Sequence, residues 1–313
     1  MQITRGVIPS AVKTVIYGPE GIGKSTLASR FPEPVFIDTE GSTKQMDVAR
    51  LPAPDTWQDI LNEVDYIARN PESCKTLVID TADWAEIMCT KALCGDKSIE
   101  DFGYGKGYVM LAEKFRDLLT KLDTVIAVGI HVVMTAHAKM RKFEQPDEMG
   151  AYDRWEMKLS KQIAPLVKEW ADMVLFCNYK TIVINVDGQG AVKGKNKVQG
   201  GERVMYATHH NCWDAKNRFG LEDKLPMSYE SIASVIGDVP KPKPKWKELE
   251  EKMAADGVDE FDLQNLVGIR GWALSTDPIS AYSNDLLNFL LGDWEKVKEK
   301  IAEIKEETEL PFV

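Results

Sequence analysis

The sequence lacks the features of a membrane protein, a secreted protein or a strongly basic nucleic-acid coat. No run approaches the eighteen or more apolar residues of a membrane helix, and the N-terminal MQITRGVIPSAVK has neither an apolar stretch nor a signal-peptide cleavage site. The formal net charge is −10, which argues against wholesale coating of nucleic acid but not against a local basic groove. We therefore expect a soluble, cytoplasmic protein with no membrane partner.

Cysteine is scarce as well. The five cysteines form no CxxC pair and their number is odd, so neither a zinc ribbon nor a complete disulfide framework is indicated. Free thiols in a reducing compartment are the simpler interpretation. No internal repeat of solenoid length is visible. With 313 residues, 44% of them hydrophobic, the chain can bury one substantial core and still leave material for an appendage.

Apolar runs alternate with amphipathic segments, which is typical of βα units around a mainly parallel sheet. The expected strands are residues 13–17, 35–38, 76–80 and 131–135. Between the second and third strands, Thr56 and Asp59 form a capping-box pattern at the start of a helix. Between the third and fourth, apolar residues from 110 to 122 keep helical spacing. Both segments predict crossover helices.

The pattern changes after about residue 172. Shorter β-like runs at 173–177, 181–186 and 203–208, separated by the polar DGQGAVKGKNKVQGGE, suggest antiparallel strands at one edge of the sheet. The segment VPKPKPKWKE predicts a semi-rigid linker. The expected fold class is therefore α/β, with a core at 1–238, a linker at 239–248, and a small helical module with an acidic tail at 249–313.

A complete G-x-x-x-x-G-K-[ST] pattern lies between the first predicted strand and a helical segment. In such a loop, glycines let backbone N–H groups converge on phosphate oxygens, and the following helix presents its positive end. We expect Lys24 to reach the β and γ phosphates of ATP, while a glycine-rich turn without a ligand is the alternative. The expected nucleotide-binding residues are Gly18, Pro19, Glu20, Gly21, Ile22, Gly23, Lys24, Ser25 and Thr26.

The run TLVID places Asp80 at the carboxyl end of a buried strand. This is the usual position of the acid that holds magnesium through its water shell. Apolar residues followed by Asp are common, but here they stand behind a complete P-loop. We expect the Ser25 hydroxyl and Asp80 to hold Mg²⁺, so that ATP and Mg²⁺ are the cofactors.

At residues 35–41 the sequence VFIDTEG resembles the RecA/RadA-like recombinase ATPases. The resemblance implies a RecA-like P-loop core in which Glu40 is the general base that polarises the attacking water, while Asp38 is structural. A solvent-facing turn carboxylate is the alternative for Glu40. The run HVVMTAH places His137 where these ATPases carry a polar sensor, commonly Gln. A satisfied surface histidine is the alternative there.

The segment Lys216-Asn217-Arg218-Phe219-Gly220 resembles the KNRFG motif of RadA and related hexameric helicase-type ATPases. The resemblance implies that Lys216 and Arg218 act catalytically in the nucleotide site of an adjoining subunit, so that the protein works as a ring or filament of itself. A basic turn is the alternative. Over residues 10–226 the set resembles phage-encoded RecA-like ATPases of single-strand annealing and recombination, which would act in the host cytoplasm.

In RecA-like folds two loops hold single-stranded DNA, and the sequence offers counterparts to both. The first is FGYGKGY at 102–108, where aromatics suited to base stacking alternate with glycines. The second follows His137 and precedes the acidic EQPDEMGAYDRWE. Flexible surface turns are the alternative for each. The expected DNA-binding residues are Tyr104, Lys106, Tyr108, Lys139, Arg141 and Lys142. A third patch, either a basic hairpin on phosphates or a solvated loop, comprises Lys193, Lys195, Lys197 and Arg203.

Two functions from different classes fit this sequence. The leading hypothesis is a Mg-dependent ATPase that binds single-stranded DNA and promotes annealing or strand exchange. The second is an ATP-controlled assembly or regulatory protein that acts on a protein partner without DNA. A small-molecule kinase is disfavoured because no acceptor-binding lid is evident. The tail EETELPFV resembles the tip of bacterial single-strand binding proteins, although Val313 follows the Phe; an ordinary terminus is the alternative.

Overall fold

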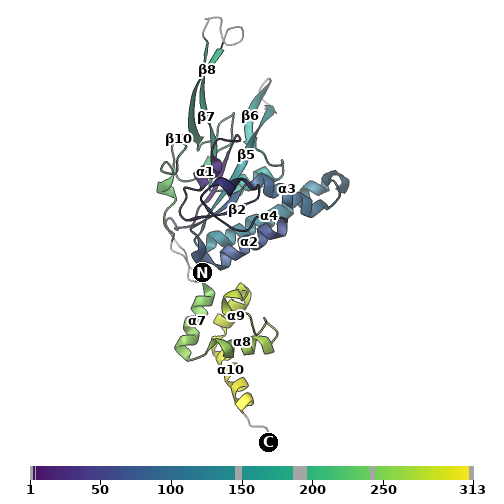
Figure 1. Ribbon diagram of the computed structural model, residues 1–313, viewed down its shortest axis with the longest axis vertical. Coiled ribbons are helices and arrows are strands. Elements are labelled where there is room, and N and C mark those ends of the chain that lie inside the picture. The colour runs from purple at the N-terminus through teal and green to yellow at the C-terminus, as the bar shows by residue number, and fades with distance from the viewer. Residues whose placement is uncertain (1–2, 4, 145–149, 186–195, 240–243, 310–313) are drawn as a thin grey trace. The chain divides into compact units, whose positions relative to one another are not determined.

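The computed structural model (Figure 1) describes residues 3, 5–144, 150–185, 196–239 and 244–309. The chain divides into two compact units, Met1–Pro240 and Lys241–Val313. Among the residues described, no helix is both long enough and apolar enough to cross a membrane.

The first unit is built on one large sheet with the order β10-β8-β7-β1-β5-β4-β2-β3. Neighbours from β7 through β1, β5, β4 and β2 to β3 are parallel, whereas β8, β9 and β10 add antiparallel pairs at one edge. The α/β class with a mainly parallel sheet and antiparallel edge strands is therefore confirmed. The strands are β1 (Lys13–Gly18), β2 (Pro34–Asp38), β3 (Ala49–Arg50), β4 (Thr76–Asp80), β5 (His131–Glu144), β6 (Ala151–Met157), β7 (Met173–Asn185), β8 (Asn196–Tyr206), β9 (Lys216–Asn217) and β10 (Lys224–Pro226).

Side chains of the central strands alternate between two apolar layers, as the period of two in a strand requires. Val15 and Tyr17 of β1 face the layer covered by the four longer helices, while Ile16 faces the layer that contains α1. Figure 1 shows α2, α3 and α4 side by side, in agreement with their mutual contacts. The helices are α1 (Lys24–Ala28), α2 (Trp57–Arg69), α3 (Ala82–Cys94), α4 (Lys106–Ala127) and α5 (Ile163–Trp170), with short 3-10 turns η1 (Ser42–Gln45), η2 (Pro71–Ser73), η3 (Ile99–Phe102) and η4 (Ala233–Val235).

The capping box predicted at the start of α2 is present. Thr56 accepts a hydrogen bond from the backbone of Asp59, and the Asp59 carboxylate accepts one from the backbone of Thr56. The second unit is helical and has its own apolar core, which includes Leu249, Leu263 and Leu290. Its helix α7 begins at Lys245, inside the segment expected as a linker. Its elements are α7 (Lys245–Asp256), α8 (Glu260–Ile269), η5 (Ile279–Ala281), α9 (Asn284–Gly292) and α10 (Trp294–Glu309).

Two strands run much farther than the sequence predicted. We expected β5 to stop near residue 135 and a loop to follow, but it continues to Glu144 and pairs with β6 as a hairpin. The run at 173–177 and the described part of the run at 181–186 belong to one strand, β7 (Met173–Asn185), which pairs with β8 from residue 196 onward. Beyond His137, β5 is half-buried or exposed at every position, so it lacks the apolar alternation that marks a strand in sequence.

Both hairpins extend past the end of the P-loop strand. Gly18, the last residue of β1, is level with His137 of β5, and Tyr17 is level with Phe176 of β7. Figure 1 shows the β5–β6 and β7–β8 hairpins projecting from the same end of the sheet. Any ligand at the carboxyl end of β1 would therefore lie between the bases of the two hairpins.

Candidate functional site

The predicted phosphate loop is a tight turn between β1 and α1. Gly21 (φ +73°) and Gly23 (φ +104°) adopt the left-handed region that glycine tolerates best. A Cβ on Gly18 would lie 2.3 Å from the backbone oxygen of Cys177, so only glycine fits against the neighbouring strand. The loop therefore has the compact backbone that a phosphate cradle requires.

Lys24 is buried beneath this loop and is only 6% exposed. Its Nζ donates hydrogen bonds to the backbone oxygens of Gly18 (3.3 Å) and Pro19 (3.1 Å). Burial lowers the pKa of Lys24, while the negative charges of Asp80 and Asp83 act in the opposite direction. A desolvated ammonium held by neutral carbonyls is well placed to donate hydrogen bonds to phosphate oxygens instead.

Asp80 lies at the carboxyl end of β4 and is fully buried. Its Oδ1 accepts a hydrogen bond from the Thr135 hydroxyl. Its Oδ2 is buried and has no hydrogen-bond partner among the residues described. A buried, unpaired carboxylate oxygen is costly unless a ligand satisfies it. This orphaned oxygen fits a hydrated Mg²⁺, which Asp80 and the partly exposed Ser25 hydroxyl would hold.

The ends of β2 and β4 are joined beside Asp80. The Thr39 hydroxyl donates to the backbone oxygen of Thr81 and accepts from its backbone N–H, both at 2.8 Å. This pair holds the next residue, Glu40, close to the carboxyl end of β4. Asp38 has a structural contact instead: its two carboxylate oxygens accept four hydrogen bonds from the turn formed by residues 41–43.

Glu40 is half-buried and interacts electrostatically with the other charged groups near the P-loop. Burial raises the pKa of Glu40, and the charges of Asp80 and Asp83 act in the same direction, while His137 and Lys24 oppose them. A carboxylate with a raised pKa is a better proton acceptor near neutral pH than an ordinary one.

His137 is buried rather than on the surface, with 8% of its area exposed. Its Nδ1 lies 2.8 Å from Oδ2 of Asp83, and its backbone N–H donates to Oδ1 of Asp83 at 3.0 Å. Burial alone would raise the pKa of Asp83, but the hydrogen bonds and charge of His137 hold it below its usual value. The ionised carboxylate therefore accepts from Nδ1 and fixes the ring, which leaves Nε2 for a ligand.

Sequence reasoning missed Asp83. The available signal was its position three residues after Asp80, in the first turn of the helix that follows β4. Because the pairing with His137 spans 54 positions of the chain, nothing local to either residue indicated it.

Comparison with known proteins agrees with this geometry. The profile of a family described as an AAA domain matches residues 10–219, which is more than half of the chain. The chain belongs to the AAA-domain family. It is accordingly a P-loop ATPase. Its P-loop, Ser25, Asp80, Glu40 and His137 all lie at the end of the sheet where β1, β2 and β4 finish.

Two further comparisons add little. No curated protein matches this AAA-domain chain. Among solved structures it is similar to the flagellar accessory protein FlaH from Methanocaldococcus jannaschii, with 12% identity and a TM-score of 0.34, over 64% of this chain and 78% of that one.

The KNRFG segment of the AAA-domain chain lies at the opposite end of the parallel strands, where β1 and β7 begin. Lys216 begins β9, which pairs with the first residues of β7. Its Nζ donates to the backbone oxygens of Lys168 (2.9 Å), Glu169 (3.1 Å) and Ala171 (2.5 Å) at the end of α5. All three donors of the ammonium are used in this way, so Lys216 caps α5 within its own chain.

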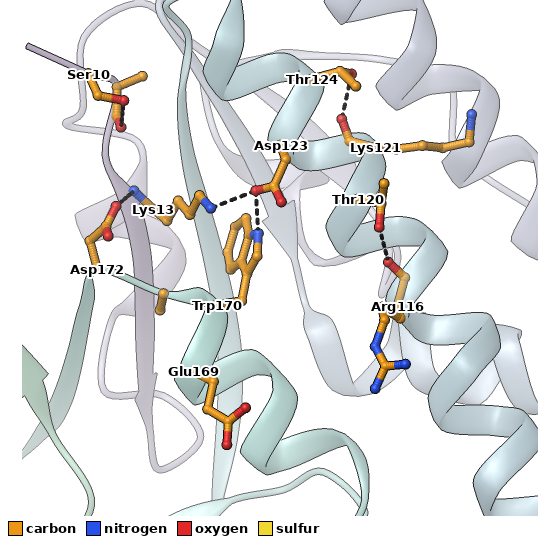
Figure 2. A network of polar contacts seen from close by, with 12 residues as sticks. Ser10, Lys13, Arg116, Thr120, Lys121, Asp123, Thr124, Glu169, Trp170 and Asp172 are labelled. Carbon is orange, nitrogen blue, oxygen red and sulfur yellow. Dashed lines mark hydrogen bonds and ion pairs between the residues drawn. The ribbon is translucent and has the colours of Figure 1, made fainter. Parts of the chain in front are cut away.

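Arg218 is more available than Lys216. Its guanidinium pairs with Asp172 at 2.9 Å, and its side chain is 58% exposed. Figure 2 shows this end of the molecule, where the other oxygen of Asp172 accepts from the backbone N–H of Lys13 and where Asp123 contacts both Lys13 and Trp170. Arg218 is thus beside the first residue of β1, whereas the P-loop follows the last one.

The expected DNA-binding residues are only partly in loops. Tyr104 is fully exposed, with Gly103 and Gly105 on either side at positive φ. Lys106 and Tyr108 belong to the first turn of α4, which begins earlier than the apolar pattern predicted. Gly107 in the same turn is buried, and a Cβ there would lie 2.4 Å from the backbone oxygen of Ile99.

The second set lies on the β5–β6 hairpin, not in a loop. Lys139 donates to the backbone oxygen of Leu159 (2.6 Å), and Arg141 pairs with Glu156 (3.2 Å). Lys142 is exposed. Lys193, Lys195, the side chain of Lys197, residues 145–149 of the acidic stretch and the tail residues 310–313 lie outside what the structure describes.

Proposed function

We propose that this chain is a Mg-dependent ATPase whose site is completed by Arg218 from a neighbouring copy, and that the assembly binds single-stranded DNA and promotes annealing or strand exchange. One observation supports the proposal of an assembly. The five steps along β1 from Lys13 to Gly18 separate Arg218 from the P-loop, a span of about 16 Å at ~3.3 Å per step. Arg218 therefore cannot reach the nucleotide of its own chain, but its exposed side chain is available to a neighbouring copy.

The surface around Arg218 suits a subunit contact. A groove of about 560 Å³ is lined by Arg218, Phe219 and the N-terminal segment 7–13. Within it Val7 is 97% exposed, Ile8 69% and Phe219 38%. Apolar side chains gathered around a cation on an exposed surface are typical of interaction sites.

The residues around the P-loop then have separate roles in hydrolysis. Lys24 and the loop amides hold the phosphates, and Glu40 takes the proton of the water whose oxygen bonds to the γ-phosphorus as the bond to ADP breaks. Bound Mg²⁺ would neutralise charge on the β and γ oxygens. Arg218 of the neighbour stabilises the charge that spreads over the transferred group.

Mixing two inactive variants tests the shared site. Arg218→Ala should bind Mg-ATP normally but hydrolyse it about 10³-fold more slowly, the lower range for an arginine finger. Glu40→Gln should be slow as well. In a mixture, some interfaces combine an intact Glu40 with an intact Arg218, so part of the ATPase rate should return when phosphate release is measured.

Arg116→Ala is the matched control, because Arg116 is an exposed arginine on α4 with no ion pair among the described residues. It should keep the wild-type rate. Normal assembly of the mixture without any recovery of hydrolysis would show that Arg218 does not act across subunits.

Single-stranded DNA is the proposed ligand because of two exposed side chains, Tyr104 and Lys142. Tyr104 presents a fully exposed ring, and a base stacked on such a ring gains about 1–3 kcal/mol. Lys142 adds an exposed cation on the hairpin that rises beside the P-loop. These two residues support contact with bases and with phosphates, respectively.

Tyr104→Ala should weaken binding of a single-stranded oligonucleotide about 5- to 150-fold, which corresponds to the loss of one stacked base. Fluorescence anisotropy with ATP present, at salt concentrations from about 50 to 200 mM, would measure this. Tyr66→Ala, which removes a 52% exposed tyrosine from α2, should bind as the wild type does. A wild-type protein that neither binds the oligonucleotide nor changes its ATPase rate with it would contradict the DNA proposal.

One observation favours a second candidate, an ATP-controlled assembly or regulatory protein with a protein partner. Two of the three cations expected on the β5–β6 hairpin, Lys139 and Arg141, already have partners in the chain. This function requires nucleotide to change particle size while Tyr104→Ala leaves activity intact. Sizing by light scattering with and without Mg-ATP, alongside the anisotropy titration, separates the two candidates.

A further inference from the structure

A second arginine lies against the P-loop of its own chain. Arg203 is on β8, opposite Tyr179 of β7. A Cβ placed on Gly23 would lie 3.0 Å from Nη1 of Arg203. The guanidinium therefore overhangs the last glycine of the phosphate loop, directly before Lys24. The same point is 3.9 Å from Cε of Met227.

The backbone of Arg203 is held firmly at this place. It pairs with β7 just beyond Cys177, whose backbone oxygen is the close neighbour of Gly18. On its other side the backbone oxygen of Arg203 accepts from the N–H of Met227 at 3.2 Å. The position over the loop is thus set by the sheet, and not only by the long side chain.

The guanidinium is also free to bind a ligand. Arg203 is exposed, and no carboxylate of the described residues forms an ion pair with it. The acidic side chains of this site, Asp80, Asp83 and Glu40, interact instead with Lys24. An arginine is planar and always charged, and it offers paired donors that match phosphate oxygens.

We propose that Arg203 is a phosphate-binding residue for the nucleotide held by the P-loop of the same chain. Its guanidinium contacts the polyphosphate from the β7–β8 side, opposite the carboxylates of β2 and β4, while Met227 forms an apolar wall beside it. Sequence alone grouped Arg203 with a basic patch for DNA phosphates. Its contact with Gly23 instead assigns it to the nucleotide.

This inference rests on the proposed function, because it requires a nucleoside polyphosphate at the P-loop. It adds an arginine supplied in cis to the one that Arg218 would supply in trans. The two are distinguishable, since Arg203 should matter for binding in an isolated chain, whereas Arg218 should matter only for hydrolysis in an assembly.

Calorimetric titration of the full-length chain with Mg-ADP, without DNA, tests the assignment. Arg203→Ala should weaken Mg-ADP binding at least about tenfold, the loss expected for a charged hydrogen bond. Arg203→Lys should recover part of the affinity, because it restores the charge but not the paired donors. Lys224→Ala removes an exposed cation from the adjoining strand β10 and should bind as the wild type does.

Lys24→Ala, titrated in parallel, separates the two possible failures. If Lys24→Ala loses Mg-ADP while Arg203→Ala keeps wild-type affinity, the assignment of Arg203 is overturned and the nucleotide site stands. If Lys24→Ala also keeps wild-type affinity, the proposed nucleotide function fails, and Arg203 with it. An effect of Arg203→Ala on DNA affinity alone would return this residue to the DNA patch.

Discussion

Replacing Lys24 with alanine is expected to lower the affinity for Mg-ATP by about 30-fold or more. Lys24 is buried under the P-loop, where, among the described residues, the backbone oxygens of Gly18 and Pro19 accept its hydrogen bonds. Removing one partner of a buried charged pair costs about 2–5 kcal/mol, and 1.4 kcal/mol is a factor of ten in affinity. Calorimetric titration with a slowly hydrolysed ATP analogue would measure the change.

The fold should survive this substitution, because burial lowers the pKa of Lys24 and therefore opposes its charge in the free protein. Thermal unfolding without nucleotide should match the wild type. A ligand at 100 times its Kd raises the free energy of unfolding by about 2.7 kcal/mol. The wild type should show this stabilisation with Mg-ATP analogue and Lys24→Ala should not. Equal stabilisation of both proteins would mean that the nucleotide binds elsewhere.

The phosphate loop could be predicted because its requirements are local. Gly21 and Gly23 need positive φ, Gly18 needs to be small against a neighbouring strand, and Lys24 lies within the same turn. Each requirement selects a residue type at a short, fixed spacing. The same applies to Asp80, since the end of an apolar run marks the end of a buried strand.

What could not be predicted depends on contacts between distant parts of the chain. Asp83 fixes His137 across 54 positions, and Arg203 reaches Gly23 from a strand at the sheet edge. Beyond His137, β5 is half-buried or exposed at every position, so it shows no apolar alternation and resembles a loop in sequence. A histidine or arginine in such a segment carries no local sign of its partner.

The KNRFG motif shows a further limit. Its resemblance implied that both cations act on a neighbour, but three carbonyls of α5 already accept from Lys216. Arg218, paired at an exposed position with Asp172, is the group we retain for that role. Lys216 instead holds the segment that carries Arg218 against the end of α5. The two cations therefore have different roles, and this difference depends on the contact between α5 and β9, which the sequence does not show.

Glu40→Gln should slow ATP hydrolysis about 10²- to 10⁴-fold, the usual contribution of a general base, while Mg-ATP affinity changes little. Glutamine keeps the size of the side chain and removes its proton-accepting charge. Burial together with Asp80 and Asp83 raises the pKa of Glu40, so the same group should make the rate fall as the pH drops through that raised pKa. Single-turnover phosphate release across pH, compared with analogue binding, would measure both effects.

Asp47→Asn is the matched control, because it neutralises an exposed carboxylate farther along the same connection, and it should hydrolyse ATP at the wild-type rate. A wild-type rate for Glu40→Gln would contradict the proposed chemistry as a whole. Asp38 and Asp83 already accept hydrogen bonds at both oxygens, and Asp80 is the carboxylate that fits the metal. Of the four carboxylates that end β2 and β4 or follow them, Asp38, Glu40, Asp80 and Asp83, Glu40 is therefore the one left to take the proton of the attacking water.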